Sequence, residues 1–218
     1  MITLSEENYL KAIFLLSLST NEKVSTNIIA AEIGTSAASV SDMLKKLQEK
    51  KLVEYEKYKG AYLTKKGRAL ASSVVRKHRL WETFLVNKLN FDWGEVHDVA
   101  EQLEHIKSEK LVDRLDSFLK YPSFDPHGEP IPTKNGEIPD TNTVPLNKLK
   151  TGTAGKVMGV TIDEKYFLDY LTKLNISIGT EIKLLEKISF DQSLNIKIET
   201  TNQHISHEVA KHLLIKMI

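Results

Sequence analysis

The stretch VSTNIIAAEIGTSAASVSDMLKKLQEKKLVEYEKYKGAYLTKKGRAL, residues 24–70, decides the fold of the N-terminal part of this chain. The Ser-Thr pair at 25–26 can cap a short helix, which ends at Gly34 because glycine tolerates the positive φ of a helix C-terminus. The Thr-Ser pair at 35–36 can cap a second helix over about residues 37–50. Two short helices joined by a tight glycine-containing turn predict a helix-turn-helix.

The residues after this second helix predict a wing. LVEYEKY and AYLT have the composition of β strands and flank a tight turn at Lys59-Gly60. A plain helical hairpin would lack such a β hairpin, so the combination favours a winged helix-turn-helix that binds DNA. Thr64 then caps a long helix, which we expect to reach about Leu89.

Small polar residues and lysines surround the second helix, which is the predicted recognition helix. Those that we expect to reach the major groove are Ser36, Ala37, Ser39 and Asp42. Those that we expect to contact phosphates are Lys45, Lys46, Lys57, Lys59, Lys65 and Lys66. Residues 1–80 carry 14 Lys and Arg against 8 Asp and Glu, whereas residues 81–218 carry 16 against 21. The basic N-terminal part suits a polyanionic partner such as double-stranded DNA.

The composition excludes several classes of protein. Of 218 residues, 41% are hydrophobic and 27% charged, which is ordinary for a globular protein of one to three domains. There is no cysteine, so disulfides and thiolate metal ligands are excluded. No apolar run approaches the roughly 18 residues that span a bilayer, and the start does not resemble a signal peptide. We therefore expect a cytoplasmic protein without a membrane partner.

Histidines and carboxylates recur at helical spacing in HDVAEQLEHI, residues 97–106. The side chains that share one side of an ideal helix there are His97, Glu101, Glu104 and His105. A second pair, His78 and Glu82, lies four residues apart on the long preceding helix. Such a stripe can be a solvated surface, but two of them on neighbouring helices also suit a divalent metal ion. Sulfur-free ligands favour Mn²⁺ and, less so, Fe²⁺, and Zn²⁺ would also bind.

The rest of the chain predicts helices, a connector and a β domain. Helical patterns continue over residues 94–120, and residues 121–147 contain all six prolines, which indicates a connector with little regular structure. The last 70 residues alternate like β strands around one helix, DEKYFLDYLTKLN, and predict a small β barrel. The expected fold class is therefore mainly α with small β parts.

Six strings together resemble the diphtheria toxin repressor family of metal-dependent transcription regulators, and most closely its manganese-responsive three-domain members. They are ENYLKAI at 7–13, SAASVSDMLKKL at 36–47, LTKKGRALA at 63–71, RKHRLWE at 76–82, VHDVAEQLEH at 96–105 and FDPHGEPIP at 124–132. The resemblance implies a winged helix-turn-helix domain over 1–72 and a helical metal-binding and dimerisation domain over 73–140. It also implies an SH3-like domain of the ferrous-transport-accessory (FeoA) type over 141–218.

The resemblance further implies two metal sites in each subunit of a homodimer. Carried over by position, the primary site would use Asn8, Glu101, Glu104 and His105. The ancillary site would use His78, Glu82, His97, a carboxylate from Asp163 or Glu164, and Asp125. The chain departs from the family in two places: manganese-responsive members usually have Asp where Asn8 stands, and Lys11 replaces a carboxylate with which some two-domain members build a binuclear site.

The function that these observations predict is manganese-dependent repression of metal-uptake genes through a palindromic operator. An iron(II)-dependent repressor of the same family is the main alternative, and Zn²⁺ is expected to fill the sites in vitro. A metalloenzyme would leave the wing unexplained, and the chain shows neither an HExxH motif nor a glycine-rich phosphate loop. A metal-independent winged-helix regulator would not need the ligands at Glu104 and His105.

Overall fold

The computed structural model describes residues 2–18, 23–92, 95–140, 142–162 and 164–218. Its internal contacts fall into two compact units. The first comprises Met1–His78, Glu101–Val112 and Pro132–Ile138, and the second comprises Arg79–Ala100, Asp113–Ile131 and Pro139–Ile218. Among the described residues, no helix is both long enough and apolar enough to cross a membrane.

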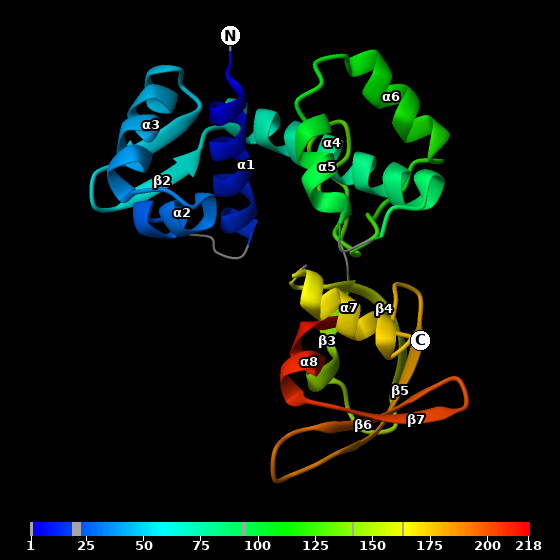
Figure 1. The fold of residues 1–218 in the computed structure, drawn as a ribbon. Helices are drawn as coiled ribbons and strands as arrows, with labels where there is room; N and C mark the ends of the chain where they lie inside the picture. Colours follow the sequence, from blue (N-terminus) through cyan, green and yellow to red (C-terminus); the bar gives the residue numbers. More distant parts are fainter. Residues whose placement is uncertain (1, 19–22, 93–94, 141, 163) are drawn as a thin grey trace. The chain divides into compact units, whose positions relative to one another are not determined.

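The first unit begins with three helices, α1 (Leu4–Leu18), α2 (Thr26–Ile33) and α3 (Ala37–Glu49). The local signals act as predicted. Ser25 caps α2 by accepting from the Ile28 amide, and Gly34 ends the helix at a φ of 71°. Ser36 caps α3 by accepting from the Ser39 amide. The apolar faces of the three helices meet in one core around Leu10, Phe14 and Leu44, and Figure 1 shows them grouped beside β2.

The predicted wing is present. Strands β1 (Val53–Glu56) and β2 (Gly60–Leu63) form an antiparallel hairpin. Val24, just before α2, exchanges backbone hydrogen bonds with Ala61 and so fastens the wing to the helices. Helix α4 (Lys65–Leu89) follows at once, with the Thr64 hydroxyl accepting from the Gly67 amide as an N-cap. Gly67 leaves no room for a side chain, because a Cβ there would lie 1.9 Å from the Leu52 carbonyl oxygen.

Two further helices, α5 (Val96–Leu103) and α6 (Glu109–Phe118), follow. The expectation that one helix carries Glu104 and His105 together with His97 is wrong. Helix α5 ends at Leu103, and Glu104 and His105 lie in the turn after it. The turn is closed by a hydrogen bond from the Ile106 amide to the Leu103 carbonyl oxygen, and it directs the Glu104 carboxylate into the interior.

The proline-rich connector has little regular structure, as predicted, but it is held firmly. Arg79 of α4 binds the Glu129 carboxylate through Nη2 at 2.6 Å and donates through Nη1 to the Pro130 carbonyl oxygen at 2.6 Å. At Gly128 the chain passes so close to strand β4 (Ala154–Val160) that a Cβ would lie 1.5 Å from the Met158 carbonyl oxygen. The part of the connector up to Ile131 therefore has a defined path within the second unit.

The C-terminal part of the second unit is a six-stranded antiparallel sheet with strand order β3-β8-β4-β5-β6-β7. Its strands are β3 (Val144–Pro145), β4 (Ala154–Val160), β5 (Glu181–Lys187), β6 (Leu194–Ile198), β7 (Thr201–Ile205) and β8 (Leu213–Met217). The short 3₁₀ helix η1 (Leu146–Lys148) follows β3, and α7 (Lys165–Lys173) is the expected helix. The expectation of a single helix here is wrong, because α8 (His207–His212), capped by Ser206, precedes β8. Figure 1 shows strands β3 to β7 of this sheet together with α7 and α8.

Candidate metal and DNA sites

The first cluster of ionisable side chains lies within the first unit, where α1 meets the end of α5. The Glu104 carboxylate is 1% exposed, and its Oε2 atom lies 2.6 Å from Lys11 Nζ and 2.6 Å from His78 Nδ1. Lys11 Nζ also lies 3.2 Å from Glu101 Oε1. A carboxylate only accepts, so the short contact with His78 has the imidazole donating through Nδ1–H.

These neighbours keep Glu104 ionised. Burial alone would raise its pKa, but the hydrogen bond from His78 and the charge and hydrogen bond of Lys11 outweigh it, so the pKa lies below the usual value. The cluster thus presents a buried carboxylate in the form that binds cations.

His105 is oriented for ligation by a neighbour on α1. Its Nδ1 lies 2.6 Å from Glu7 Oε2, and its Nε2 lies 3.8 Å from Glu104 Oε1. When Nδ1–H donates to Glu7, the lone pair of Nε2 faces Glu104. A carboxylate behind a histidine is the usual arrangement around metal-ligating imidazoles. The predicted ligand Asn8 is exposed on α1, and it is the adjacent Glu7 that contacts His105.

The second predicted set has His78 and Glu82 one turn apart on α4. The Glu82 carboxylate is 2% exposed and lies 3.5 Å from Nδ1 of His97 at the start of α5. One possible ligand atom from each of His78, Glu82 and His97 lies within 4.8 Å of the other two. The arrangement has the ligand types and spacing that a divalent cation requires.

A third group in the second unit shares Glu82 and adds two residues of the connector. Glu82, Asp125 and His127 are all buried, and their possible ligand atoms also lie within 4.8 Å of one another. The Asp125 side chain is fully buried; Oδ1 accepts from the amides of His127 and Glu129, while Oδ2 has no hydrogen-bond partner. Arg79 Nε lies 3.6 Å from Oδ2, beyond hydrogen-bonding distance.

The electrostatics of this third group suit a cation. Burial, reinforced by the negative charges of Glu82 and Glu129, raises the pKa of Asp125 to about 7. Glu82 and Asp125 are two buried acids, and Asp125 Oδ2 accepts no hydrogen bond. A metal ion would relieve this combination, so Glu82, Asp125 and His127 fit a divalent cation. His127 was not predicted as a ligand, although its position two residues after Asp125 was a possible signal.

Of the two predicted ligands from the C-terminal part, the structure describes Glu164, which belongs to neither group. Glu164 is exposed and stands just before α7, where its side chain makes no capping hydrogen bond. Asp163 lies outside the described residues.

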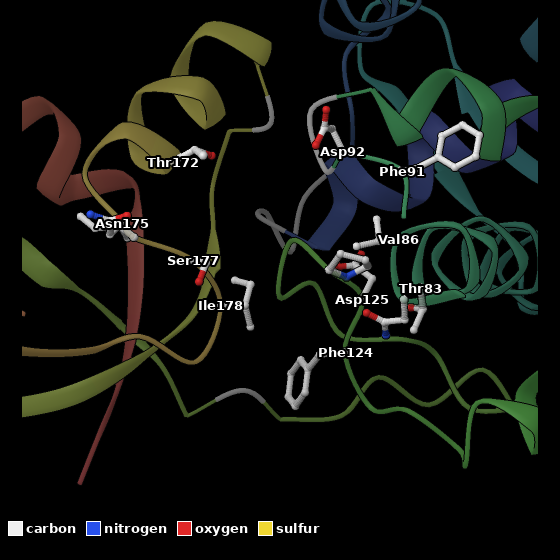
Figure 2. A pocket seen from close by; sticks show the side chains of 13 residues that line it. Thr83, Val86, Phe91, Asp92, Phe124, Asp125, Thr172, Asn175, Ser177 and Ile178 are labelled. Carbon is white, nitrogen blue, oxygen red and sulfur yellow. The ribbon is translucent and has the colours of Figure 1, made fainter. Parts of the chain in front are cut away.

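A cleft of about 720 Å³ opens beside the third group (Figure 2). Its walls come from α4, the connector around Phe124 and the residues after α7, including Ile178. Among the lining side chains that the structure describes, the only carboxylates are Asp92 and Asp125. Apart from these two carboxylates, the described lining residues are apolar or uncharged, so the cleft offers no further candidate ligand set of its own.

Most of the predicted DNA-binding residues lie on α3, at its N-cap and on the wing. Ser39, Asp42, Lys45 and Lys46 are exposed, and Lys45 pairs with Asp42 at 3.1 Å. Ser36 is exposed, but its hydroxyl is the cap of α3. Ala37 is half-buried against the hydrophobic core. On the wing, the Lys57 ammonium lies over the Tyr58 ring, and Lys59 forms an ion pair with Glu56.

Three family profiles match successive parts of the chain. They are the iron-dependent repressor N-terminal DNA-binding domain over residues 1–61, the iron-dependent repressor metal-binding and dimerisation domain over 64–133, and the FeoA domain over 144–217. The match to a DNA-binding and a dimerisation domain indicates DNA and a second copy of the chain as partners.

Curated relatives agree with these profiles. The iron-dependent repressor IdeR of Mycobacterium tuberculosis is 36% identical over 155 residues, which are 67% of each chain. The diphtheria toxin repressor of Corynebacterium diphtheriae is 30% identical over 73% of this chain and 75% of its own. A probable metal transport system membrane protein of Chlamydia trachomatis is 46% identical over 72 residues, but this match covers only 16% of its length.

Solved structures match over nearly the whole chain. A manganese-dependent transcriptional repressor in complex with manganese is 34% identical with a TM-score of 0.86, covering 98% of this chain and 100% of its own. The manganese regulator SloR is 38% identical with a TM-score of 0.75, covering 98% of both chains. ScaR with bound Cd²⁺ is 31% identical with a TM-score of 0.78, covering 98% of this chain and 99% of its own.

Proposed function

Because this chain belongs to the iron-dependent repressor family of metal-dependent transcription repressors, which are not enzymes, we propose that its activating ion is Mn²⁺ and that it represses metal-uptake genes. The observation that carries the choice of ion is the first cluster. Glu101, Glu104 and His105 are hard oxygen and nitrogen ligands without sulfur, and such ligands suit Mn²⁺. Structural relatives named as manganese regulators support the same ion. Fe²⁺ remains the alternative, since curated relatives are named iron-dependent.

We assign the primary site to Glu101, Glu104 and His105, with Glu7 orienting His105 and Asn8 beside it on α1. The support is the contact of His105 with Glu7 and the orientation of its Nε2 toward Glu104. We assign the ancillary site to Glu82 with His78, His97, Asp125 and His127. The support is that Glu82 belongs to both groups of possible ligands. Asp163 or Glu164 remains the proposed ligand from the C-terminal domain, and the domain boundaries proposed are 72/73 and 140/141.

The proposed mechanism uses the link between α1 and the turn after α5. Glu7 belongs to the helix that packs behind the helix-turn-helix, and His105 belongs to the turn that follows α5. The Lys11 ammonium balances only part of the negative charge of Glu101 and Glu104, and a bound divalent ion would neutralise the remainder. The residues of the link then hold α1 in one orientation, and in a symmetric dimer this orientation sets the spacing of the two recognition helices. A palindromic operator has half-sites at a fixed spacing, so the dimer binds it well only when its two recognition helices have the matching spacing.

The proposal is tested by titrating double-stranded DNA against the protein with Mn²⁺, Fe²⁺ or Zn²⁺ at fixed salt, since DNA affinity depends on salt. The DNA is selected from a random library by the manganese-loaded protein. We expect Mn²⁺ to raise the affinity about 5- to 150-fold over chelated protein, the usual range of allosteric coupling. Equal affinity with and without metal would contradict metal activation, and a larger effect of Fe²⁺ would favour the iron alternative.

The lysines on α3 provide a second test, of the proposed DNA face. Lys46 is exposed and would contact phosphate, so Lys46→Ala should weaken binding about three- to tenfold for every sequence and reduce the salt slope by about one. Lys165→Ala, at an exposed lysine of α7, is the matched control and should leave both quantities unchanged. Fluorescence anisotropy at several salt concentrations measures them. If both variants behave alike, α3 is not the DNA face.

A further inference from the structure

We propose that residues 129–138 of the connector form a strap that stiffens α4 where this helix passes from the first unit into the second, and that the strap restricts the orientation of the DNA-binding domain. Helix α4 contains a boundary between the two units, which falls between residues 78 and 79. The connector passes from the second unit to the first between residues 131 and 132. The inference goes beyond the proposed function, because it holds whichever ion activates the protein.

Two buried arginines of α4 hold the strap, one on each side of this boundary. Arg79 donates through Nη1 to the Pro130 carbonyl oxygen at 2.6 Å. Arg76 donates through Nη1 to the Pro132 carbonyl oxygen at 3.4 Å. A single residue separates the two prolines, and the ring of each proline fixes its φ near −65°. The strap therefore passes between the units as a short and stiff segment.

The end of the strap is anchored on the first unit. The Thr133 amide donates to the Glu137 carbonyl oxygen at 2.8 Å, which closes a turn. This turn lies against α4, because a Cβ added to Gly136 would lie 2.8 Å from the Ser72 Oγ atom. Ile138 then packs against the hydrophobic core of the helix-turn-helix. Residues 134–138 lie between the matched family profiles, so this anchor belongs to neither matched domain.

The contacts of the strap follow one face of α4. Ser72, Arg76 and Arg79 are spaced by four and three residues, so their side chains share a face of the helix. The strap contacts them in reverse order and therefore runs antiparallel to α4. Bending a helix toward or away from one face changes the spacing of the residues along that face. Because the strap ties this face on both sides of the boundary, it opposes such bending.

The test measures the distance between a probe on α2 and a probe near the end of α4 in the full-length chain. Because the chain has no cysteine, Glu32→Cys and Asn87→Cys place two spin labels at exposed positions only. The labelled chain is mixed with an excess of unlabelled chain, so that a labelled dimer carries one labelled copy. Pulsed electron paramagnetic resonance in chelator then gives the distribution of this distance. We expect Ile138→Ser, which removes the apolar anchor, to widen the distribution about twofold.

A second variant and a control keep the test decisive. Replacing residues 132–138 with a Gly-Ser segment of equal length removes the anchor altogether and should widen the distribution at least as much as Ile138→Ser. Ile2→Ser is the matched control, because Ile2 packs against the same core from outside the strap. It should leave the width unchanged. Hydrogen–deuterium exchange at Thr133 and Gly136, whose amides are hydrogen-bonded, verifies that Ile138→Ser releases the strap.

DNA affinity at saturating metal is the functional measurement. A DNA-binding domain with more freedom is in the binding-competent orientation less often, so both strap variants should bind DNA about five- to tenfold more weakly than the wild type. The inference is overturned if the Gly-Ser variant keeps the wild-type width, or if a wider distribution leaves DNA affinity unchanged. A wild type whose DNA affinity does not respond to metal would instead contradict the proposed function. The distance measurement in chelator would be unaffected, so the two failures are distinguishable.

Discussion

Replacing His105 with alanine should lower the Mn²⁺-dependent DNA affinity about 100-fold, close to the full coupling expected between ion and DNA. His105 is the only residue of the proposed primary site that contacts Glu7 of α1 among the contacts described, at 2.6 Å. Its loss removes one proposed ligand and also the Glu7–His105 contact, one of the contacts between α1 and the turn after α5. The variant should therefore bind DNA in Mn²⁺ nearly as weakly as the chelated wild type.

The measurement is DNA binding by fluorescence anisotropy, with and without Mn²⁺, at one salt concentration. His204→Ala is the control, because His204 is an exposed histidine of β7 that contacts Asn195 in the C-terminal sheet. It should retain the wild-type response. If His105→Ala also retains it, the ion does not act through this link.

Replacing Gly67 with alanine should destabilise the winged helix-turn-helix domain by about 3 kcal/mol, the upper range for overpacked sites. The added Cβ would lie 1.9 Å from the Leu52 carbonyl oxygen and 2.9 Å from its carbonyl carbon. Backbone atoms cannot rotate away as a side chain can, so α4 and the start of the wing would have to separate. The site also contains the Thr64 cap, which binds both the Leu52 carbonyl oxygen and the Gly67 amide.

Hydrogen–deuterium exchange of α3 and the β1–β2 hairpin in increasing urea measures this loss for the N-terminal domain itself. Gly152→Ala is the comparison, because Gly152 has a φ of 87° but a Cβ added there would meet no atom within 4 Å. Only the left-handed backbone opposes that substitution, at about 1–2 kcal/mol. Similar behaviour of α3 and the hairpin in the two variants would show that the close approach at Gly67 does not matter.

Local structure was predictable where its cause is local. Ser25, Ser36 and Gly34 act within one turn of their own positions, so the bounds of α2 and α3 were predicted within two residues. The same holds for the Thr64 cap of α4. Helix α8 was missed because its six residues lie between two strands and are too few for a helical periodicity to stand out.

The candidate sites were predictable only in part, because they depend on contacts far apart in the sequence. The spacing of His78 and Glu82 on α4 is local, and both residues lie in the predicted group. Glu104 was placed on the wrong element, since its burial beside Lys11, 93 residues away, is a tertiary contact that periodicity does not contain. His127 was not among the predicted ligands for the same reason, because only the fold brings it to Glu82.

The sulfur-free donor sets of these clusters have a consequence for redox chemistry. Peroxide inactivates cysteine-ligated sensors by converting the thiolate to sulfenic and then sulfinic acid. Carboxylate oxygens and imidazole nitrogens do not undergo that conversion, and the chain has no cysteine at all. A regulator built in this way should keep reporting metal supply at peroxide concentrations that silence a thiolate-ligated sensor.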